Sequence, residues 1–459
     1  MNSSAILVNN DVKLNTKVLN QDDSQFSREN ILNQPTIKLV DSDPSNELDL
    51  FCYINCKRSD PEFIRQCRGL VYHKDDLILK TFPYTLEYIE SENEEVIKEL
   101  PTLKNCLFFE SYEGCIIKVF NFNNKWYVAT NRKLDAYKSS WSSKESFGTL
   151  FEKALKYHFS NSSAPFTGDN IMDHFLSLLD ESKQYMFLLL NNSDNRIVCD
   201  APENPTVFHV GTYKNGELNM KDKITIPYPK QLEFSNLESI YEYVHTIDYK
   251  KLQGVIIFAP NNKQLKILNT DYKDLYDSRG NEPSINFRYL QVRNNSSQLE
   301  MLQFLYPDKI KDFESYEDMI KNTVTNIYES YVRRFIKKEY VTLSPEEYRV
   351  MSEAHSWHQQ DRKTNRISLA KIADILNEQE PTKINRIIRR IKMERSGRPI
   401  KVNARLLNMV RPIQQKNISE VDDDKVDDKV DDNVDDKVDD KVDDKVDDTA
   451  DDKSLNETV

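Results

Sequence analysis

The chain has few glycines and cysteines and no long apolar run. Only 9 of its 459 residues are glycine, so each is expected where the backbone needs a positive φ or a close approach. The six cysteines are scattered, which is typical of reduced thiols inside a cell. The longest apolar runs, such as YMFLLL and GVIIFAP, are strand-length and far below the roughly 20 residues that span a bilayer.

The start MNSSAILVNN lacks the basic residues and the apolar stretch of a signal peptide. The sequence therefore predicts a cytoplasmic protein with no membrane partner. A metal site is not expected either. Cys52 and Cys56 lack a second Cys/His pair, and His355 and His358 lack the acidic residue of an HExxH pattern.

Most of the excess negative charge lies at one end of the chain. Residues 420–459 hold 19 of the 75 acidic and 6 of the 63 basic residues, which leaves 56 acidic and 57 basic residues elsewhere. A nearly neutral body has no global field that attracts a polyanion, so any nucleic-acid contact has to be local.

Composition divides the chain into four parts. Residues 1–45 are rich in Asn, Ser and Asp and are expected to be flexible, whereas 46–297 alternate short β-type runs with helical patterns. This mixture predicts an α+β domain. Residues 298–417 have helical spacing throughout and predict an all-α domain. Residues 418–459 repeat VDDK, which offers too little apolar surface for a core and predicts disorder.

The expected elements follow from these patterns. Three helices are predicted inside the α+β domain and five in the α domain, the latter including one that begins at Ser344-Pro345 with a capping residue and proline at its first position. The predicted helices cover 147–159, 171–181, 237–247, 297–306, 316–340, 344–360, 368–379 and 382–396. The predicted strands include RGLVYH, LILKTF, CLFFES, CIIKVF, KWYVAT, YMFLLL, NRIVCD, TVFHV, GVIIFA and QLKILN.

A basic segment precedes the acidic tail. Residues 383–416 contain 11 Lys or Arg and one acidic residue, and the candidates for nucleic-acid contact are Arg386, Arg389, Arg390 and Lys392. The tail either masks this segment or binds a protein partner, or it only keeps the chain soluble beside a solvated basic face.

Three glycines stand in a suggestive order, because each opens a β-type run: Gly69, Gly114 and Gly254. The segments around them are RQCRGLVY, FFESYEGCIIKVF, KWYVATNRKLDAYKSSW, YMFLLLNNSDNRIVCD, KLQGVIIF and QLKILNTDY. Over residues 50–295 their order resembles the phage-type RNA ligases of the covalent nucleotidyltransferase superfamily. The resemblance implies a nucleotidyltransferase fold, ATP or GTP with Mg²⁺ as cofactors, and RNA as a partner.

The chain departs from that pattern at most of the positions that carry the family's chemistry. Lys266 remains, but Gln253 stands where the family has a metal-binding glutamate. The other departures are Ser111 for the nucleophilic lysine, Glu113 for the neighbouring aspartate, Leu188 for the ribose-binding glutamate and Leu268 for the second terminal lysine.

These changes bear directly on catalysis. A lysyl phosphoramidate needs an amine in line with the α-phosphate and cations for the developing charge. Serine at 111 would need a base, for which Glu113 is the candidate close in sequence. By period-2 alternation Lys118 shares a face with Ile116 and is a candidate phosphate contact or replacement nucleophile, or is a surface lysine.

Three interpretations stay open. The first is an RNA-ligase-like protein that binds a nucleotide or RNA end through Arg68, Lys118, Leu188 and Lys266 but has lost lysine adenylylation. The second is an active ligase or nucleotidyltransferase with rearranged catalytic residues. The third is a non-enzymatic scaffold that reuses the fold and contacts protein partners through the helical domain or the acidic tail. A virus-encoded protein suits this resemblance.

Overall fold

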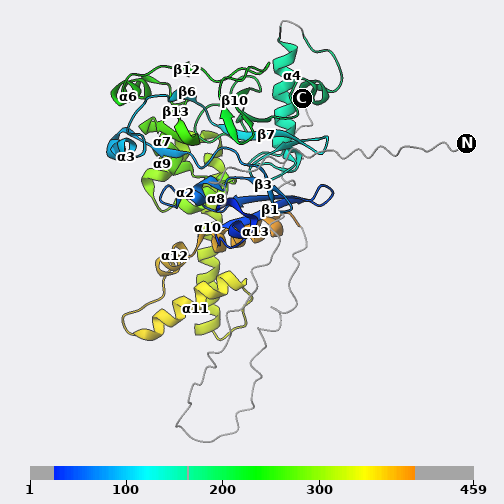
Figure 1. Ribbon diagram of the computed structural model, residues 1–459. Helices are drawn as coiled ribbons and strands as arrows, with labels where there is room; N and C mark the ends of the chain where they lie inside the picture. The colour runs from blue at the N-terminus through cyan, green and yellow to red at the C-terminus, as the bar shows by residue number, and fades with distance from the viewer. Residues whose placement is uncertain (1–24, 163–164, 398–459) are drawn as a thin grey trace, which may run out of the picture. The chain divides into compact units, whose positions relative to one another are not determined.

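The structure is a computed structural model that describes residues 25–162 and 165–397. The acidic tail, the start of the chain and the end of the basic segment lie outside these residues. The chain divides between Lys311 and Asp312 into two compact units, which are coloured in chain order in Figure 1. Strands are confined to the first unit in the described residues, so the α+β prediction is confirmed.

The first unit contains three sheets, in which every pairing is antiparallel except that of β14 with β5. The four-stranded sheet has the spatial order β1 (Ile37–Asp43), β2 (Leu48–Tyr53), β3 (Leu70–His73) and β4 (Asp76–Leu79). The first five-stranded sheet has the order β11 (Glu217–Asn219), β10 (Val207–Lys214), β9 (Gln184–Leu190), β7 (Gly114–Phe122) and β8 (Lys125–Ala129). The second five-stranded sheet has the order β12 (Gln231–Leu232), β6 (Leu107–Ser111), β13 (Gly254–Ala259), β14 (Lys263–Leu268) and β5 (Leu86–Tyr88).

Side-chain alternation sorts these strands into layers. On β7, Ile117 and Val119 pack with helices α4 (Phe147–Ser160) and α5 (Ile171–Ser177), whereas Phe120 packs with residues of the other two sheets. On β13, Val255 and Ile257 pack with α3 (Asn93–Glu99) and α6 (Leu237–Thr246). The two five-stranded sheets therefore each carry helices on one face and share an apolar layer on the other, and Figure 1 shows α4 beside β7 and α6 beside β13.

The helices of the first unit are mostly short and begin at polar caps. Ser146 and Asn269, for example, accept from backbone N–H groups of the first turns of α4 and α7. The helices are α1 (Arg28–Leu32), α2 (Glu62–Gln66), α3 (Asn93–Glu99), α4 (Phe147–Ser160), α5 (Ile171–Ser177), α6 (Leu237–Thr246), α7 (Thr270–Arg279), α8 (Ile285–Val292) and α9 (Ser296–Leu305). Short 3-10 turns lie at Glu90–Glu92, Ala136–Lys138, Pro260–Asn262 and Pro307–Lys309.

Two stretches differ from expectation. Residues 25–45 contain α1 and β1, and Phe26 and Ile31 are buried with Tyr72, although their polar composition suggested a flexible start. The predicted strand NRIVCD is wrong, because residues 191–200 form no strand. Its backbone N–H groups at Ile197 and Val198 bind the Glu113 carboxylate instead of a neighbouring strand.

The second unit is helical in its described residues. The predicted cap at Ser344 is present, and it forms a full capping box, because Ser344 and Glu347 each accept from the other's backbone N–H. Its elements are α10 (Ile310–Tyr331, which begins just before the division), a π-helical turn (Val332–Ile336), α11 (Pro345–Gln360), α12 (Leu369–Asn377) and α13 (Pro381–Arg395). All eight helices predicted from spacing are found, with ends that shift by a few residues.

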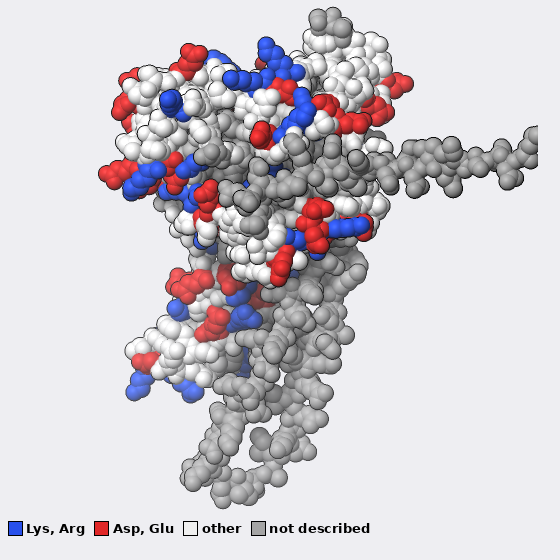
Figure 2. Space-filling view, in the orientation of Figure 1, with Lys and Arg blue, Asp and Glu red and all other residues white. Residues whose placement is uncertain are grey.

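Basic and acidic side chains are interspersed over the described residues on the face drawn in Figure 2, as expected for a nearly neutral body. All six cysteines are free, which agrees with their scattered positions. Within the described part of the chain, no helix is both long enough and apolar enough to cross a bilayer.

Candidate nucleotide-binding site

A cavity lies between the two five-stranded sheets. Five residues chosen from the sequence line it together: Arg68, Ser111, Leu188, Gln253 and Lys266. They come from segments far apart in the chain. Ser111, Leu188 and Lys266 lie on strands β6, β9 and β14, whereas Arg68 and Gln253 lie just before β3 and β13. The residues grouped by their resemblance to the RNA-ligase motifs therefore also lie together in the fold.

Gln253 is the centre of the polar end of this cavity. Its Oε1 accepts from Ser111 Oγ at 3.0 Å and from Lys266 Nζ at 2.9 Å, and its Nε2 donates to the Tyr272 hydroxyl at 2.7 Å. Ser111 and Gln253 are buried. The serine hydroxyl is therefore directed at an amide oxygen, which does not serve as a general base.

Glu113 lies on the far side of Tyr272. The Tyr272 hydroxyl donates to Glu113 Oε1 at 2.8 Å, and the backbone N–H groups of Ile197 and Val198 donate to the same carboxylate at 3.3 and 2.9 Å. Burial raises the pKa of Glu113, and these hydrogen bonds oppose that rise. Both carboxylate oxygens are thus already engaged, and Ser111 is linked to Glu113 only through Gln253 and Tyr272.

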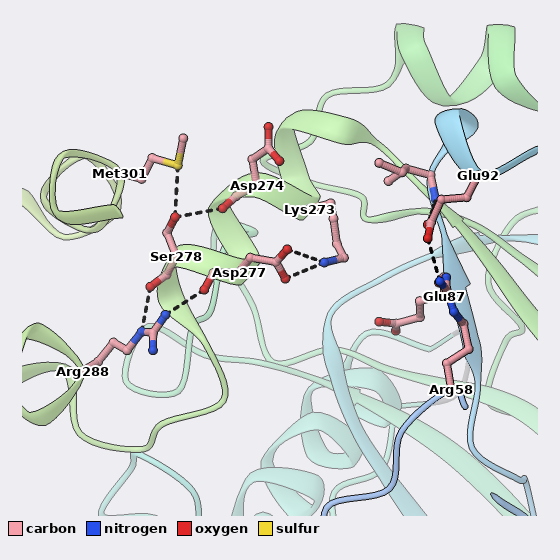
Figure 3. A network of polar contacts seen from close by, with 10 residues as sticks. Arg58, Glu87, Glu92, Lys273, Asp274, Asp277, Ser278, Arg288 and Met301 are labelled. Carbon is pink, nitrogen blue, oxygen red and sulfur yellow. Dashed lines mark hydrogen bonds and ion pairs between the residues drawn. The ribbon is translucent and has the colours of Figure 1, made fainter. Parts of the chain in front are cut away.

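Lys266 is held by a carboxylate from a strand that is distant in sequence. Its Nζ lies 3.2 Å from Glu87 Oε1, because β14 pairs in parallel with β5 and places Lys266 opposite Glu87. Arg58 donates to the Glu87 carbonyl at 3.0 Å and to Glu92 at 2.7 Å. Figure 3 shows Arg58 beside these two glutamates.

Helix α7, which carries Tyr272, is fixed at its other end. Arg288 donates to the carbonyls of Ser278 and Asp277, both at 2.8 Å, and the Ser278 hydroxyl donates to the Asp274 carbonyl (Figure 3). A basic side chain at the end of a helix satisfies carbonyls that have no partner within the helix. The anchored helix holds the Tyr272 hydroxyl between Gln253 and Glu113.

Lys118 is fully buried and lies outside the cavity lining. Its Nζ donates to the Gly69 carbonyl at 2.8 Å. Gly69 has φ +71°, and a Cβ there would lie 2.2 Å from Lys118 Nζ. Burial, together with the charge of Arg68, lowers the pKa of Lys118 to about 7. The Lys118 side chain is therefore hydrogen-bonded to the Gly69 carbonyl, next to Arg68, which lines the cavity.

The other end of the cavity is apolar and largely aromatic. Phe109 and Tyr228 lie nearly parallel with ring centroids 6.2 Å apart, and Phe82 and Phe258 lie 5.6 Å apart. Glu110, at the rim, accepts from Tyr112, Tyr243 and Lys230. Burial opposes ionisation of Glu110, but these three donors together lower its pKa. Flat apolar walls beside a cationic end suit a base and its phosphates.

The basic candidates in the second unit lie on α13. Ile384, Ile387 and Ile388 are buried, which turns Arg386, Arg389 and Lys392 to the exposed side and leaves Arg390 partly covered. Arg386 lies 4.0 Å from Glu346, and Lys392 lies over the Tyr316 ring at 4.6 Å. Within the described residues, Arg386 is the member of this exposed set with an acidic neighbour, whereas Lys392 contacts an aromatic ring and Arg389 has neither kind of contact.

The histidine pair is explained by packing. His355 stacks on Phe335 with ring centroids 3.7 Å apart, and His358 Nδ1 lies 2.5 Å from the Asn365 carbonyl. Among the residues that the structure describes, no three His, Cys, Asp or Glu side chains are placed to hold a metal ion.

Three residues of this candidate site were not predicted from the sequence. Tyr272 and Glu87 join the network described above, and Gln264 lines the cavity. Gln264 could have been found, because it precedes Lys266 by two positions on one strand face. Glu87 could not, because its register against β14 is a tertiary pairing.

Comparisons with known proteins point to viral relatives. An "Immediate-early protein ICP-46 homolog" of Invertebrate iridescent virus 6 is 28% identical over 370 residues, covering 74% of this chain and 80% of that protein. The homolog of Invertebrate iridescent virus 3 is 31% identical over 263 residues, covering 55% of this chain, which spans 56% of that relative.

A "Putative bifunctional polynucleotide kinase/RNA ligase" of Autographa californica nuclear polyhedrosis virus is 25% identical over 286 residues. The match covers 58% of this chain and 38% of that protein. No protein-family profile matches the chain.

Solved structures with similarity include a "Putative ATP-dependent DNA ligase from Aquifex aeolicus" (TM-score 0.34, 14% identity, 72% of this chain and 79% of that chain). An "Archaeal ATP-dependent RNA ligase" has a TM-score of 0.34 and 11% identity over 58% of this chain and 64% of that chain. Scores of this size do not by themselves establish a shared fold.

Proposed function

We propose that this chain is an RNA-ligase-like protein that binds a nucleotide or an RNA end and does not adenylylate itself on lysine in the usual way. The observation that supports it best is the Gln253 centre. There Ser111, which stands at the position of the family's nucleophilic lysine, donates a hydrogen bond to the Gln253 amide oxygen, and Lys266 is neutralised in part by Glu87. The viral relative named as a kinase/RNA ligase adds support for the class.

A nucleotide fits the cavity better than a metal ion does. The aromatic end suits a base, and Lys266 and Arg68 are cations at the other end. Mg²⁺ prefers free carboxylate oxygens, but Glu113 and Glu110 already accept three hydrogen bonds each. We therefore propose ATP or GTP as the ligand and assign no step to a metal.

The proposal also covers the binding partners of the protein and the place where it acts. The exposed cations of α13 are the local positive charge that an RNA backbone needs. Relatives from iridescent viruses support a virus-encoded protein that acts inside the infected cell. A protein partner is proposed for the acidic repeat, which lies outside the described residues.

The test is the intact mass of the full chain after incubation with ATP or GTP and Mg²⁺ or Mn²⁺. We expect no adduct, together with measurable binding of labelled nucleotide at equilibrium. An acid-labile gain of one nucleotide would overturn the proposal, because a phosphoramidate is acid-labile, and Lys118→Ala would then show whether Lys118 has become the nucleophile. Absence of both adduct and binding would favour a scaffold that reuses the fold.

A further inference from the structure

The end of helix α10, in the second unit, carries a dense group of basic side chains. The helix passes into the π-helical turn Val332–Ile336, and residues 332–340, the basic turn, hold four basic residues and one acidic residue. A π-helical turn within a helix is rare and frequently marks a functional site. The acidic residue, Glu339, pairs with Arg333 at 2.8 Å. The other three basic residues of the turn form no ion pair in the described part of the chain.

Basic side chains from α11 and from the loop after it lie beside the basic turn. His355 of α11 stacks on Phe335 with ring centroids 3.7 Å apart. Burial lowers the pKa of His355, and four basic neighbours lower it further: His358, Arg362, Lys338 and Arg334. The last three of these neighbours have no acidic partner among the residues that the structure describes. Their positive charge is therefore available to an anionic ligand.

Lys338 has a backbone conformation that ordinarily belongs to glycine. Its φ is +58°, and a side chain in this left-handed region costs free energy. Glycine is the usual residue where a helix ends in this conformation. Lys74, the other lysine with a positive φ in the described residues, pairs with Glu47 at 3.0 Å, whereas Lys338 is exposed and has no such partner there. A strained lysine at this place is accounted for if its ammonium contacts a ligand.

An exposed aromatic ring follows these cations in the chain. Tyr340 is 60% exposed, and within the described residues its side chain makes no hydrogen bond, ring contact or cation–π contact. On α11, Tyr348 is 43% exposed, and the Arg334 guanidinium lies over its ring at 5.4 Å. Exposed rings beside cations suit single-stranded RNA, because unpaired bases stack on rings while the phosphates meet the cations. An acidic peptide would use the cations alone.

We propose that the basic turn binds single-stranded RNA, with backbone phosphates at Arg334, Lys338 and Arg362 and a base stacked on Tyr340. The inference rests on the proposed RNA binding and assigns to it a surface separate from α13. The acidic repeat of residues 418–459 is the competing occupant, because its charge is complementary. Its VDDK units contain no aromatic ring or base, so a contribution of the Tyr340 ring to binding distinguishes the two occupants.

The test measures binding of a fluorescein-labelled oligouridine strand to the full chain by anisotropy at several salt concentrations. Replacing Arg334, Lys338 and Arg362 together by Gln should weaken binding and make log K less steep against log salt by about 2, since each phosphate contact to a single strand contributes about 0.7. The charge control replaces three exposed lysines of the first unit by Gln: Lys98, Lys104 and Lys221.

The aromatic part of the surface is tested in the same assay. Tyr340→Ala should weaken binding about tenfold, a loss typical of one stacked base, and should leave the salt dependence unchanged. Tyr340→Phe keeps the ring and should bind as wild type does. Equal affinity of wild type and Tyr340→Ala would overturn the stacking of a base on this ring.

Lys338→Gly separates RNA binding from folding. Glycine relieves the positive φ at this position, so the variant should unfold at a higher temperature than wild type. It should nevertheless bind the RNA more weakly, because the ammonium is removed. Unchanged RNA affinity in this variant would show that Lys338 contacts no phosphate and would overturn the inference.

The outcomes separate this inference from the broader proposal. Wild-type RNA binding that no substitution in the basic turn changes overturns the inference and leaves RNA binding to another surface. Absence of RNA binding by wild type overturns both the inference and the RNA part of the proposed function, whereas nucleotide binding in the cavity is measured separately. A peptide of residues 420–459 that binds this surface while RNA does not would identify the acidic repeat as the occupant. Tighter binding of an oligodeoxythymidine strand of equal length would overturn RNA as the ligand.

Discussion

Lys118 Nζ donates to the carbonyl of Gly69 at 2.8 Å, and a Cβ on Gly69 would lie only 2.2 Å from that nitrogen. The contact joins β7 to the residue before β3, so it ties the middle of one sheet to the start of another. Two of the sequence signals, a rare glycine and an unexplained lysine, thus belong to one feature.

Gly69→Ala should destabilise the protein by about 2–4 kcal/mol, through a strained positive φ and a clash with Lys118. Gly216→Ala is the matched control, since Gly216 has φ +82° and nothing within 4 Å of an added Cβ. Urea unfolding of both variants measures the difference. Equal losses would mean that the close approach to Lys118 does not matter.

The stability of wild type relative to Lys118→Met should rise between pH 7 and about pH 10.5. Burial lowers the folded-state pKa of Lys118 to about 7 from 10.5, so in this window the unfolded chain holds more protons than the folded one and stability increases with pH. The slope should approach, at most, about 1.4 kcal/mol per pH unit. Denaturation midpoints of the two proteins across this range test it, and a constant difference would contradict a buried, neutralised lysine.

Tyr272→Phe should cost about 1–3 kcal/mol, because it removes the donor to Glu113 and the acceptor of Gln253 while keeping the ring. Tyr276→Phe, on the same helix, is the control for loss of a hydroxyl. Chemical denaturation gives the two values. If they were alike, the Tyr272 hydroxyl would contribute nothing particular to this network.

Replacing Arg386, Arg389 and Lys392 together by Gln should weaken RNA binding and flatten its dependence on salt. Each phosphate contact to a single strand contributes about 0.7 to the slope of log K against log salt, so the slope should fall by roughly 2. Lys74, Lys138 and Lys251, all exposed, replaced in the same way form the control. An unchanged slope would exclude α13 as the anchor, and removal of residues 420–459 would show whether the tail masks it.

Periodicity predicted eight of the thirteen α-helices in the described residues, because an amphipathic stripe such as Ile384, Ile387 and Ile388 on α13 is local information. It missed α1, α2, α3, α7 and α8, which are ten residues or shorter. It failed at Ile197 and Val198, whose apolar, β-branched character suggests a strand. There the backbone N–H groups are taken by Glu113 from another part of the chain. The local sequence pattern does not show that a distant carboxylate binds these backbone N–H groups in place of a neighbouring strand.

Motif order grouped several residues that line one cavity, but it also offered Lys118, which lies outside the lining, and it did not predict the hydrogen bonds between them. Ser111, Gln253 and Lys266 were identified from motif order, and the cavity brings them together. That Lys266 pairs with Glu87 depends on a parallel register between β14 and β5. Glu113 accepts a hydrogen bond from Tyr272 and not from Ser111, and this depends on the position of α7, which carries Tyr272. Both are tertiary facts, set by packing of elements that are far apart in sequence.

The Tyr272 hydroxyl has one proton, and this limits how the site can evolve. With glutamine at position 253, the Tyr272 hydroxyl donates a hydrogen bond to Glu113 and accepts one from the Gln253 amide N–H. Gln253→Glu alone would set two carboxylates in competition for the hydroxyl proton, and Ser111→Lys alone would add a cation beside Lys266 without a new counter-charge. A lysine at position 111 therefore calls for a coupled change at position 253, because either substitution alone leaves a charge without its partner.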